Sequence, residues 1–179
     1  MTVISSDMFK IAILLGALLI SGPSDEMFDK LKGADSEQTA ARAEADIVAS
    51  WNDSGSGTVD LLMERAGIAE QAGDEELARA LYDRIVIIAP EYSEGWYRRA
   101  ALFLRQENYS EALRDMNETL AVEPRHFPAW TGVGFILEQL GSRKEALDAY
   151  ETALEVHPYL VPAKRGQARL KRDTTGTAL

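Results

Sequence analysis

The sequence repeats itself at a fixed interval of 34 residues. The stretch "EALRDMNETLAVEP" at 111–124 is followed 34 residues later by "EALDAYETALEVHP" at 145–158. A more divergent block precedes both, since Pro90, Pro124 and Pro158 are spaced at the same interval. This period is typical of helical hairpins that stack into a solenoid, because one such hairpin cannot bury its apolar face alone.

Each block has the apolar spacing of two helices separated by a short break, such as Gly141-Ser142 in the third block. One aligned column holds small residues, which would let the two helices approach closely beside a column of large side chains. The small column is Ala66, Ala100 and Gly134, and the large one is Tyr82, Met116 and Tyr150. The proline that closes each block cannot continue a helix and predicts the turn into the next block.

The third block, "AWTGVGFILEQLGSRKEALDAYETALEVHP", resembles the tetratricopeptide repeat (TPR). The resemblance implies an all-α fold, a right-handed α-solenoid of three TPR-like helical hairpins with a C-terminal capping helix. We expect a repeat domain at 58–173 and a disordered tail at 174–179. The expected repeats lie at about 59–92, 93–126 and 127–160, and the expected capping helix at 161–172. The family is a protein-binding scaffold in many settings, so the resemblance specifies the fold more closely than the function.

Residues 25–57 are expected to form an N-terminal helical hairpin cap and a linker. The apolar spacing predicts helices at Asp25–Lys32 and Ser36–Trp51, and "NDSGSG" at Asn52–Gly57 predicts a flexible joint. We expect this hairpin to cover the N-terminal end of the solenoid. A partner-binding arm is the alternative.

Residues 1–24 are interpreted as a cleaved signal peptide. The ten apolar residues "IAILLGALLI" at 11–20 are too few to span a bilayer but suit the hydrophobic region of an export signal. Small residues follow, with a cut expected before Asp25, and translation from Met8 would give a purely basic start. The alternatives are a buried helix and an uncleaved anchor. The prediction is a bacterial periplasmic or secreted protein that meets the membrane only during export.

The composition argues against several classes of function. The net charge of −10 disfavours nucleic-acid binding, and the lack of cysteine excludes disulfides, thiolate metal sites and cysteine nucleophiles. The two histidines, His126 and His157, fall in the turns between repeats, where they could cap helix ends or lie in solvent. No phosphate-binding loop or acid–base motif is present. We therefore expect no enzyme activity, no cofactor and no metal.

The resemblance implies that the first helix of each repeat lines a concave groove. On this basis we predict a peptide-binding groove in which arginines bind carboxylates and aromatic rings provide apolar anchors. The predicted residues are Tyr97, Arg98, Arg105, Phe135, Gln139, Arg165 and Arg169. The family's carboxylate clamp is not reproduced, because Met63 and Gly67 occupy two of its columns. The alternative is that these arginines only balance neighbouring glutamates.

The predicted function is non-catalytic protein binding, as an adaptor or assembly factor of the cell envelope. The expected partner is a protein or peptide with an acidic or C-terminal carboxylate feature. The alternative is a structural scaffold that self-associates into a homo-oligomer, through Trp51, the N-terminal hairpin or one end of the solenoid.

Overall fold

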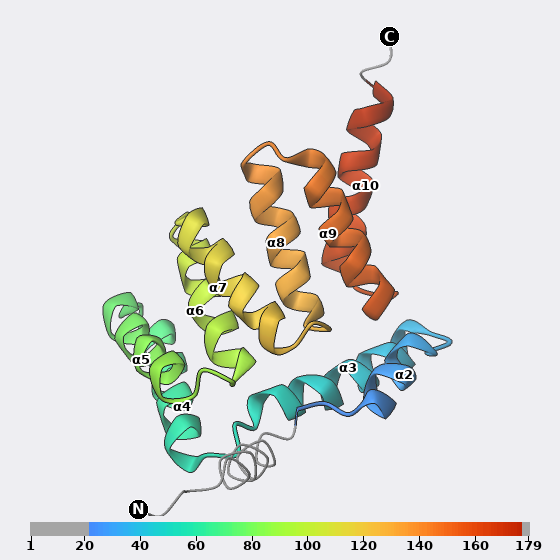
Figure 1. The fold of residues 1–179 in the computed structure, drawn as a ribbon. Helices are drawn as coiled ribbons and strands as arrows, with labels where there is room; N and C mark the ends of the chain where they lie inside the picture. Colours follow the sequence, from blue (N-terminus) through green and yellow to red (C-terminus); the bar gives the residue numbers. More distant parts are fainter. Residues whose placement is uncertain (1–21, 177–179) are drawn as a thin grey trace, which may run out of the picture.

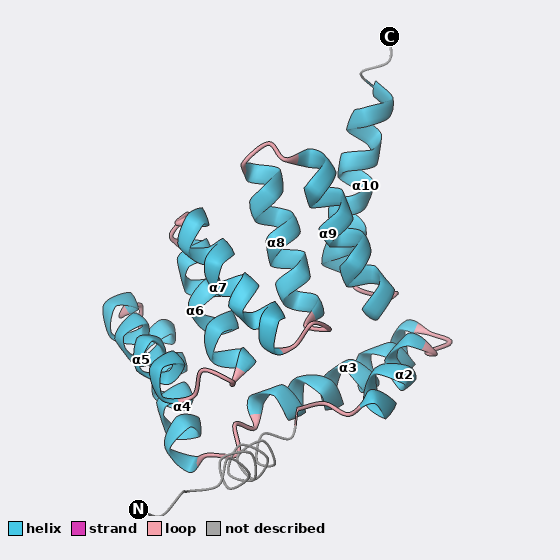
Figure 2. Cartoon of the chain, viewed as in Figure 1, coloured by secondary structure: helices cyan, strands magenta, loops and turns pink. Residues whose placement is uncertain are grey.

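The computed structural model describes residues 22–176, in which all regular structure is helical (Figures 1 and 2). Most of the predicted signal peptide lies outside the described residues, as does the end of the predicted tail. The helices are α2 (Asp25–Lys32), α3 (Glu37–Asn52), α4 (Gly57–Gln71), α5 (Glu75–Ile88), α6 (Ser93–Arg105), α7 (Tyr109–Val122), α8 (Phe127–Gln139), α9 (Arg143–Val156) and α10 (Val161–Gly176).

Three antiparallel helix pairs, α4–α5, α6–α7 and α8–α9, stack in chain order, and α10 packs on the last pair (Figure 1). The predicted all-α solenoid is confirmed. Helix α10 continues past the predicted end at residue 172, because neither glycine nor proline interrupts the chain between Gly166 and Gly176. Part of the predicted disordered tail is therefore helical.

The turn inside each helix pair uses the same backbone geometry three times. Gly73, Glu107 and Gly141 are 34 residues apart, and each has a positive φ, of 76°, 59° and 80°. In each turn the next amide donates to a carbonyl five residues earlier, as Ser142 N does to Leu137 O at 2.8 Å. This is the Schellman closure of a helix, which favours glycine at the left-handed position. Only the second repeat places a side chain there.

Close packing in the last repeat depends on the ring of Tyr150, which is 2% exposed. A Cβ atom on Gly134 would lie 2.8 Å from this ring, and one on Gly166 would overlap it on the α10 side. The two glycines therefore let α8 and α10 approach the ring directly. The predicted pairing of a small residue with a large one is confirmed here, and α10 extends it.

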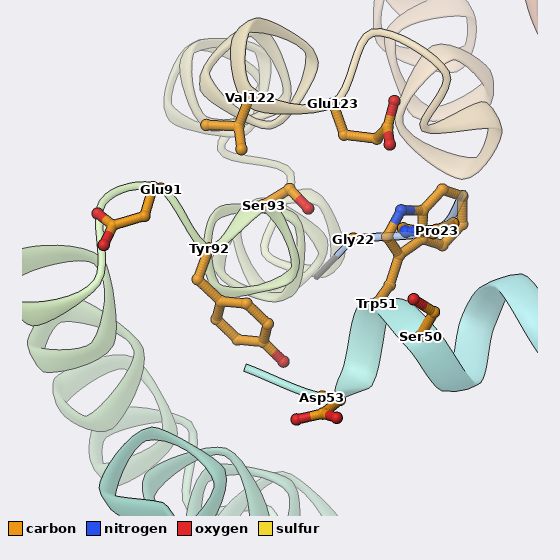
Figure 3. Close-up of a pocket in the computed structure, with 10 residues that line it drawn as sticks. All are labelled: Gly22, Pro23, Ser50, Trp51, Asp53, Glu91, Tyr92, Ser93, Val122 and Glu123. Atoms are coloured by element: carbon orange, nitrogen blue, oxygen red, sulfur yellow. The ribbon is translucent and has the colours of Figure 1, made fainter. Parts of the chain in front are cut away.

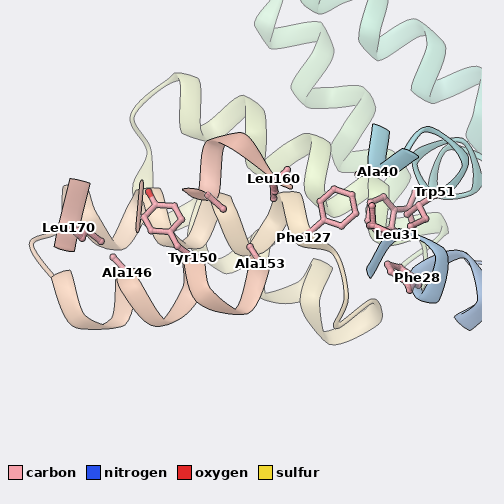
Figure 4. Close-up of a cluster of buried hydrophobic side chains, with 12 residues drawn as sticks. Phe28, Leu31, Ala40, Trp51, Phe127, Ala146, Tyr150, Ala153, Leu160 and Leu170 are labelled. Carbon is pink, nitrogen blue, oxygen red and sulfur yellow. The ribbon is translucent and has the colours of Figure 1, made fainter. Parts of the chain in front are cut away.

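The α2–α3 hairpin does not cover the N-terminal end of the solenoid, so its expected position was wrong. It lies along what we call the turn edge, the row of inter-repeat turns at residues 89–92, 123–126 and 157–160 (Figure 1). Figure 4 shows Phe28, Leu31 and Trp51 of the hairpin beside Phe127, in one apolar cluster that continues to Tyr150 and Leu170.

Ring packing explains this position of the hairpin. Trp51 stacks on His126 with ring centroids 4.2 Å apart and contacts Phe127 at 5.1 Å. The guanidinium of Arg125 lies over the Phe28 ring at 4.0 Å and donates to Asp25 at 2.6 Å. The apolar face of the hairpin thus matches the aromatic turn edge rather than the outer face of α4.

The joint between α3 and α4 is held by hydrogen bonds. Ser54 is buried, and its backbone N–H and its hydroxyl both donate to Asp60, at 3.2 and 2.5 Å. The glycine- and serine-rich composition had predicted a flexible joint. The hydrogen bonds to Asp60 instead fix where α4 begins.

Among the described residues, no helix is both long enough and apolar enough to cross a membrane.

Replacing Glu107 by glycine should stabilise the protein. A side chain in the left-handed region costs about 1 kcal/mol, and glycine removes that strain. We expect Glu107→Gly to raise the free energy of unfolding by about 1 kcal/mol in urea denaturation. Gly141→Ala is the matched control and should lower it by a similar amount. A Glu107→Gly variant less stable than the wild type would contradict the assignment.

Candidate functional site

Helices α4, α6, α8 and α10 line two hollows on one surface of the solenoid, which we call the groove. The N-terminal hollow, of about 400 Å³, is lined mainly by α4, with Arg98 of α6 and Asn52 of α3. The C-terminal hollow, of about 360 Å³, is lined by Thr131, Phe135, Glu138, Gln139, Tyr150, Pro162, Arg165 and Arg169. The groove thus has two unlike halves.

The C-terminal hollow brings together four of the predicted binding residues. Phe135 projects from α8 with 39% of its surface exposed, although it is a large apolar side chain. Gln139 follows it on α8, and Arg165 and Arg169 face it from α10. Within residues 22–176, the exposed Arg165 side chain has no hydrogen-bond or ion-pair partner. An apolar anchor and an available guanidinium therefore lie in one hollow.

Arg169 is less available than Arg165. It donates to both carboxylate oxygens of Glu138, at 2.5 and 2.6 Å, and so ties α10 to α8. The Arg169 hydrogen bond lowers the pKa of Glu138, and burial with the Glu138 charge raises the pKa of Tyr150 to about 12. The Tyr150 hydroxyl also donates to Glu138, at 3.1 Å. These three side chains form the polar wall of the C-terminal hollow.

The other three predicted residues do not join Phe135 and Arg165. Arg98 lines the acidic N-terminal hollow and donates to Glu94 at 2.5 Å. Arg105 pairs with Glu70 of α4 at 2.7 Å. Tyr97 is half-buried and lines neither hollow, because its ring packs on His126 with centroids 4.6 Å apart.

The sequence reading missed the glutamates that hold these arginines. Glu94 and Arg98 are four residues apart on one helix, a spacing that the sequence shows directly. The Glu70–Arg105 and Glu138–Arg169 pairs are 35 and 31 residues apart, close to one repeat, which is the separation of neighbouring first helices. For these three arginines, the alternative of charge balance describes what the structure shows.

Both histidines are buried, and each has its ring nitrogens engaged. His126 Nδ1 accepts the N–H of Ala129 at 3.2 Å and thereby caps α8, so the proton of the neutral ring is on Nε2, which faces Glu94 at 3.3 Å. His157 likewise accepts from Tyr159 N and faces Glu44 of α3 at 3.1 Å. They cap turns and do not lie in solvent. Among residues 22–176, no cluster of acidic or histidine side chains could hold a metal ion.

One further charged network is structural. Asp115 is fully buried and accepts two hydrogen bonds from Arg99, at 2.6 and 3.0 Å, while Arg99 also donates to Asp83 at 2.8 Å. The network joins α5, α6 and α7. It lies outside both hollows of the groove, so we assign it to the stacking of the first two repeats.

The fold and the groove define a solenoid built for contacts between proteins. The chain belongs to the tetratricopeptide repeat family, whose sequence model matches residues 36–93 and 97–161. A TPR repeat-containing protein of Rhizobium etli is 35% identical over 134 residues, which are 75% of this chain. The chain spans 66% of the length of that relative.

Solved TPR domains have a similar fold at low sequence identity. The Sgt2 TPR domain from Aspergillus fumigatus superposes with a TM-score of 0.62 at 24% identity, covering 68% of this chain and 82% of that domain. The first TPR of Spaghetti (RPAP3), bound to the HSP90 peptide SRMEEVD, gives 0.62 at 20% identity, with coverages of 65% and 93%.

We expect Glu138→Gln to lower the free energy of unfolding by about 1 kcal/mol at neutral pH, because Arg169 loses its charged partner. The pKa of Glu138 is lowered in the folded protein, so its contribution is present above its ordinary value and is lost as the pH falls through the folded pKa. Urea unfolding of both proteins from pH 7 to pH 3 should therefore show the difference shrinking. A difference that is constant with pH would contradict the ion pair.

Proposed function

We propose that this chain is a non-catalytic protein-interaction module, an adaptor or assembly factor that binds a peptide segment of a partner in the groove. The observation that carries the proposal is the C-terminal hollow, where exposed Phe135 faces Arg165. An exposed aromatic side chain in a hollow is a typical anchor for a partner side chain. A guanidinium without an internal partner favours a carboxylate, which it can bind with two parallel hydrogen bonds.

The charge of the groove favours one orientation of the peptide. The N-terminal hollow contains Asp60, Glu64 and Glu70 around a single arginine, Arg98, which Glu94 already neutralises. Acidic residues of a ligand would be repelled there and attracted to the α10 end, where the α10 segment at 161–172 carries five cationic residues and no acidic one. We therefore propose that the acidic or C-terminal end of the peptide lies at α10.

A TPR neighbour supports a peptide of this charge. The peptide in the Spaghetti (RPAP3) structure, SRMEEVD, is acidic toward its end. In this chain Met63 and Gly67 stand in the N-terminal hollow, in columns where the family's clamp has polar residues. The proposed carboxylate contact is accordingly placed on Arg165 of α10.

We also propose export to a bacterial periplasm or to the medium, on the basis of the apolar run at 11–20. N-terminal sequencing of the protein from fractionated cells tests this proposal. A cut before Asp25 would remove Pro23, which is buried, and Ser24, whose carbonyl accepts the N–H of Met27 at 3.1 Å. A mature N-terminus upstream of Pro23 would preserve both contacts.

A second candidate function is self-association through the uncovered N-terminal end of the solenoid. Five of the nine large apolar side chains found exposed in the described residues lie on α4 and α5: Leu61, Ile68, Leu77, Ile87 and Ile88. Leu61 and Ile68 are seven residues apart and therefore share one face of α4. An apolar face of this kind favours a protein contact.

The groove proposal predicts a specific cross-link. A photo-reactive phenylalanine analogue at position 135 should capture one defined partner from the native cell fraction. The same analogue at Ile87, which is 71% exposed on α5, should not capture it. Adding Arg165→Glu should weaken the capture about tenfold, as expected for a lost charge-assisted contact. Lys144→Glu is the matched charge reversal, at an exposed position on α9 outside the groove, and should leave the capture unchanged. Equal capture from positions 135 and 87 would overturn the groove assignment.

The self-association candidate predicts a concentration-dependent mass. Sedimentation velocity of the wild type should show a dimer or larger species at high concentration, and Ile68→Glu should abolish it by placing a charge on the apolar face. Gln71→Glu, an exposed change of charge on the same helix, is the control. A wild type that is monomeric at all concentrations would exclude this candidate.

A further inference from the structure

A third hollow, separate from the groove, lies where the α2–α3 hairpin meets the turn edge. Its volume is about 320 Å³, and it is bounded by the end of α3, the turn between α5 and α6, and the end of α7 (Figure 3). It shares no lining residue with either hollow of the groove. We call it the Trp51 hollow.

Two buried polar atoms of this hollow have no hydrogen-bond partner within residues 22–176, namely Trp51 Nε1 and the Tyr92 hydroxyl. Their side chains are 4% and 3% exposed. In contrast, the indole N–H of Trp96 donates to Pro90 O and that of Trp130 to Pro124 O, both at 2.8 Å. Buried polar groups in proteins are almost always paired, so the two atoms indicate that a partner for them is missing.

The placement of these two side chains brings their polar ends to the same hollow. In Figure 3 the Tyr92 ring extends from the start of α6 toward the end of α3, where Asp53 lies. The Trp51 ring reaches the hollow from α3, beside Pro23. A ligand in this space would need an oxygen that accepts from the indole and a group that pairs with the phenol.

The charge of the hollow favours a cation. Its lining includes the carboxylates of Asp53, Glu91 and Glu123 and contains no lysine, arginine or histidine. It also adjoins the C-terminal ends of α3 and α7, where unpaired carbonyls carry partial negative charge. The N-terminus of α6 acts in the opposite direction, but the buried Glu94 in its first turn compensates it.

The state of the tyrosine agrees with this charge. Burial, together with the carboxylates of Glu94, Asp60 and Asp53, raises the pKa of Tyr92. Its hydroxyl therefore stays neutral and can both donate and accept. Of the three carboxylates that line the hollow, Glu123 is already paired with Arg125 at 3.1 Å, and Asp53 accepts the N–H of Gly55 at 3.0 Å.

We propose that the Trp51 hollow binds the free N-terminal residue of a polypeptide. The α-ammonium group donates to Asp53 and to the Tyr92 oxygen, and the first carbonyl oxygen accepts from Trp51 Nε1. A carboxylate or phosphate is disfavoured because the lining is acidic. A quaternary ammonium has no N–H to donate and brings no acceptor for the indole.

The probe for this site is L-leucinamide, which has a free α-ammonium next to a carbonyl, and the control ligand is N-acetyl-L-leucinamide. In titrations followed by ¹H–¹⁵N NMR, leucinamide should shift the indole resonance of Trp51 and leave those of Trp96 and Trp130 in place. The acetylated compound should bind at least about tenfold more weakly, because it lacks the ammonium. Equal binding of the two compounds, or no shift with either, means that only water occupies the hollow and overturns the proposal.

Variants separate the polar contacts from the packing. Tyr92→Phe and Asp53→Asn keep the shape of their side chains and should each weaken leucinamide binding about threefold to tenfold. Trp130→Phe, which loses an indole N–H outside the hollow, should leave binding unchanged. Without ligand, Tyr92→Phe should keep the melting temperature of the wild type, since its hydroxyl has no partner to lose. A fall of several degrees would show that the hydroxyl is already satisfied and would also overturn the proposal.

Discussion

The stacking of helices against one another depends on small residues that face large rings. Tyr150 lies between Gly134 and Gly166, so α8 and α10 both approach its ring without an intervening side chain. No helix pair in this chain has a core of its own, because the apolar clusters extend across pairs, as Phe103 and Met116 do with Ala129 and Val133. Because α10 packs so closely, Arg165 and Arg169 face Phe135 across a hollow, and the candidate binding site results from a packing constraint.

The turn edge has the same importance for the other side of the molecule. His126 caps α8 through Nδ1, faces Glu94 through Nε2, and offers its ring face to Trp51. Arg98 in turn balances Glu94, whose side chain is 5% exposed. One buried carboxylate thus connects a predicted groove residue to the docking of the α2–α3 hairpin. Arg98 is for this reason a poor probe of ligand binding, since changing it would also leave a buried charge uncompensated.

The sequence predicted the helix pairs well because the 34-residue period acts on every repeat at once. It also placed Phe135, Gln139, Arg165 and Arg169 in one hollow, since a column on first helices maps directly to the groove. It failed for the hairpin, because Ile47 and Trp51 belong to no repeated column and nothing in their spacing says which surface they meet. The glutamate partners of Arg105 and Arg169 were missed for a related reason: contacts between adjacent repeats join residues about one period apart, and only their side-chain geometry shows which ones pair.

The displaced hairpin has two consequences for function. It leaves Leu61 and Ile68 exposed at an end of the solenoid that a covering helix would bury. It also creates the Trp51 hollow, which exists only because the end of α3 lies against the α5–α6 turn. In a solenoid whose hairpin covered α4, the indole of Trp51 would not reach Tyr92, and the turn edge would be open to solvent. The surfaces proposed here for self-association and for N-terminal recognition therefore have a common origin in the aromatic stacking of Trp51 on His126 and Phe127.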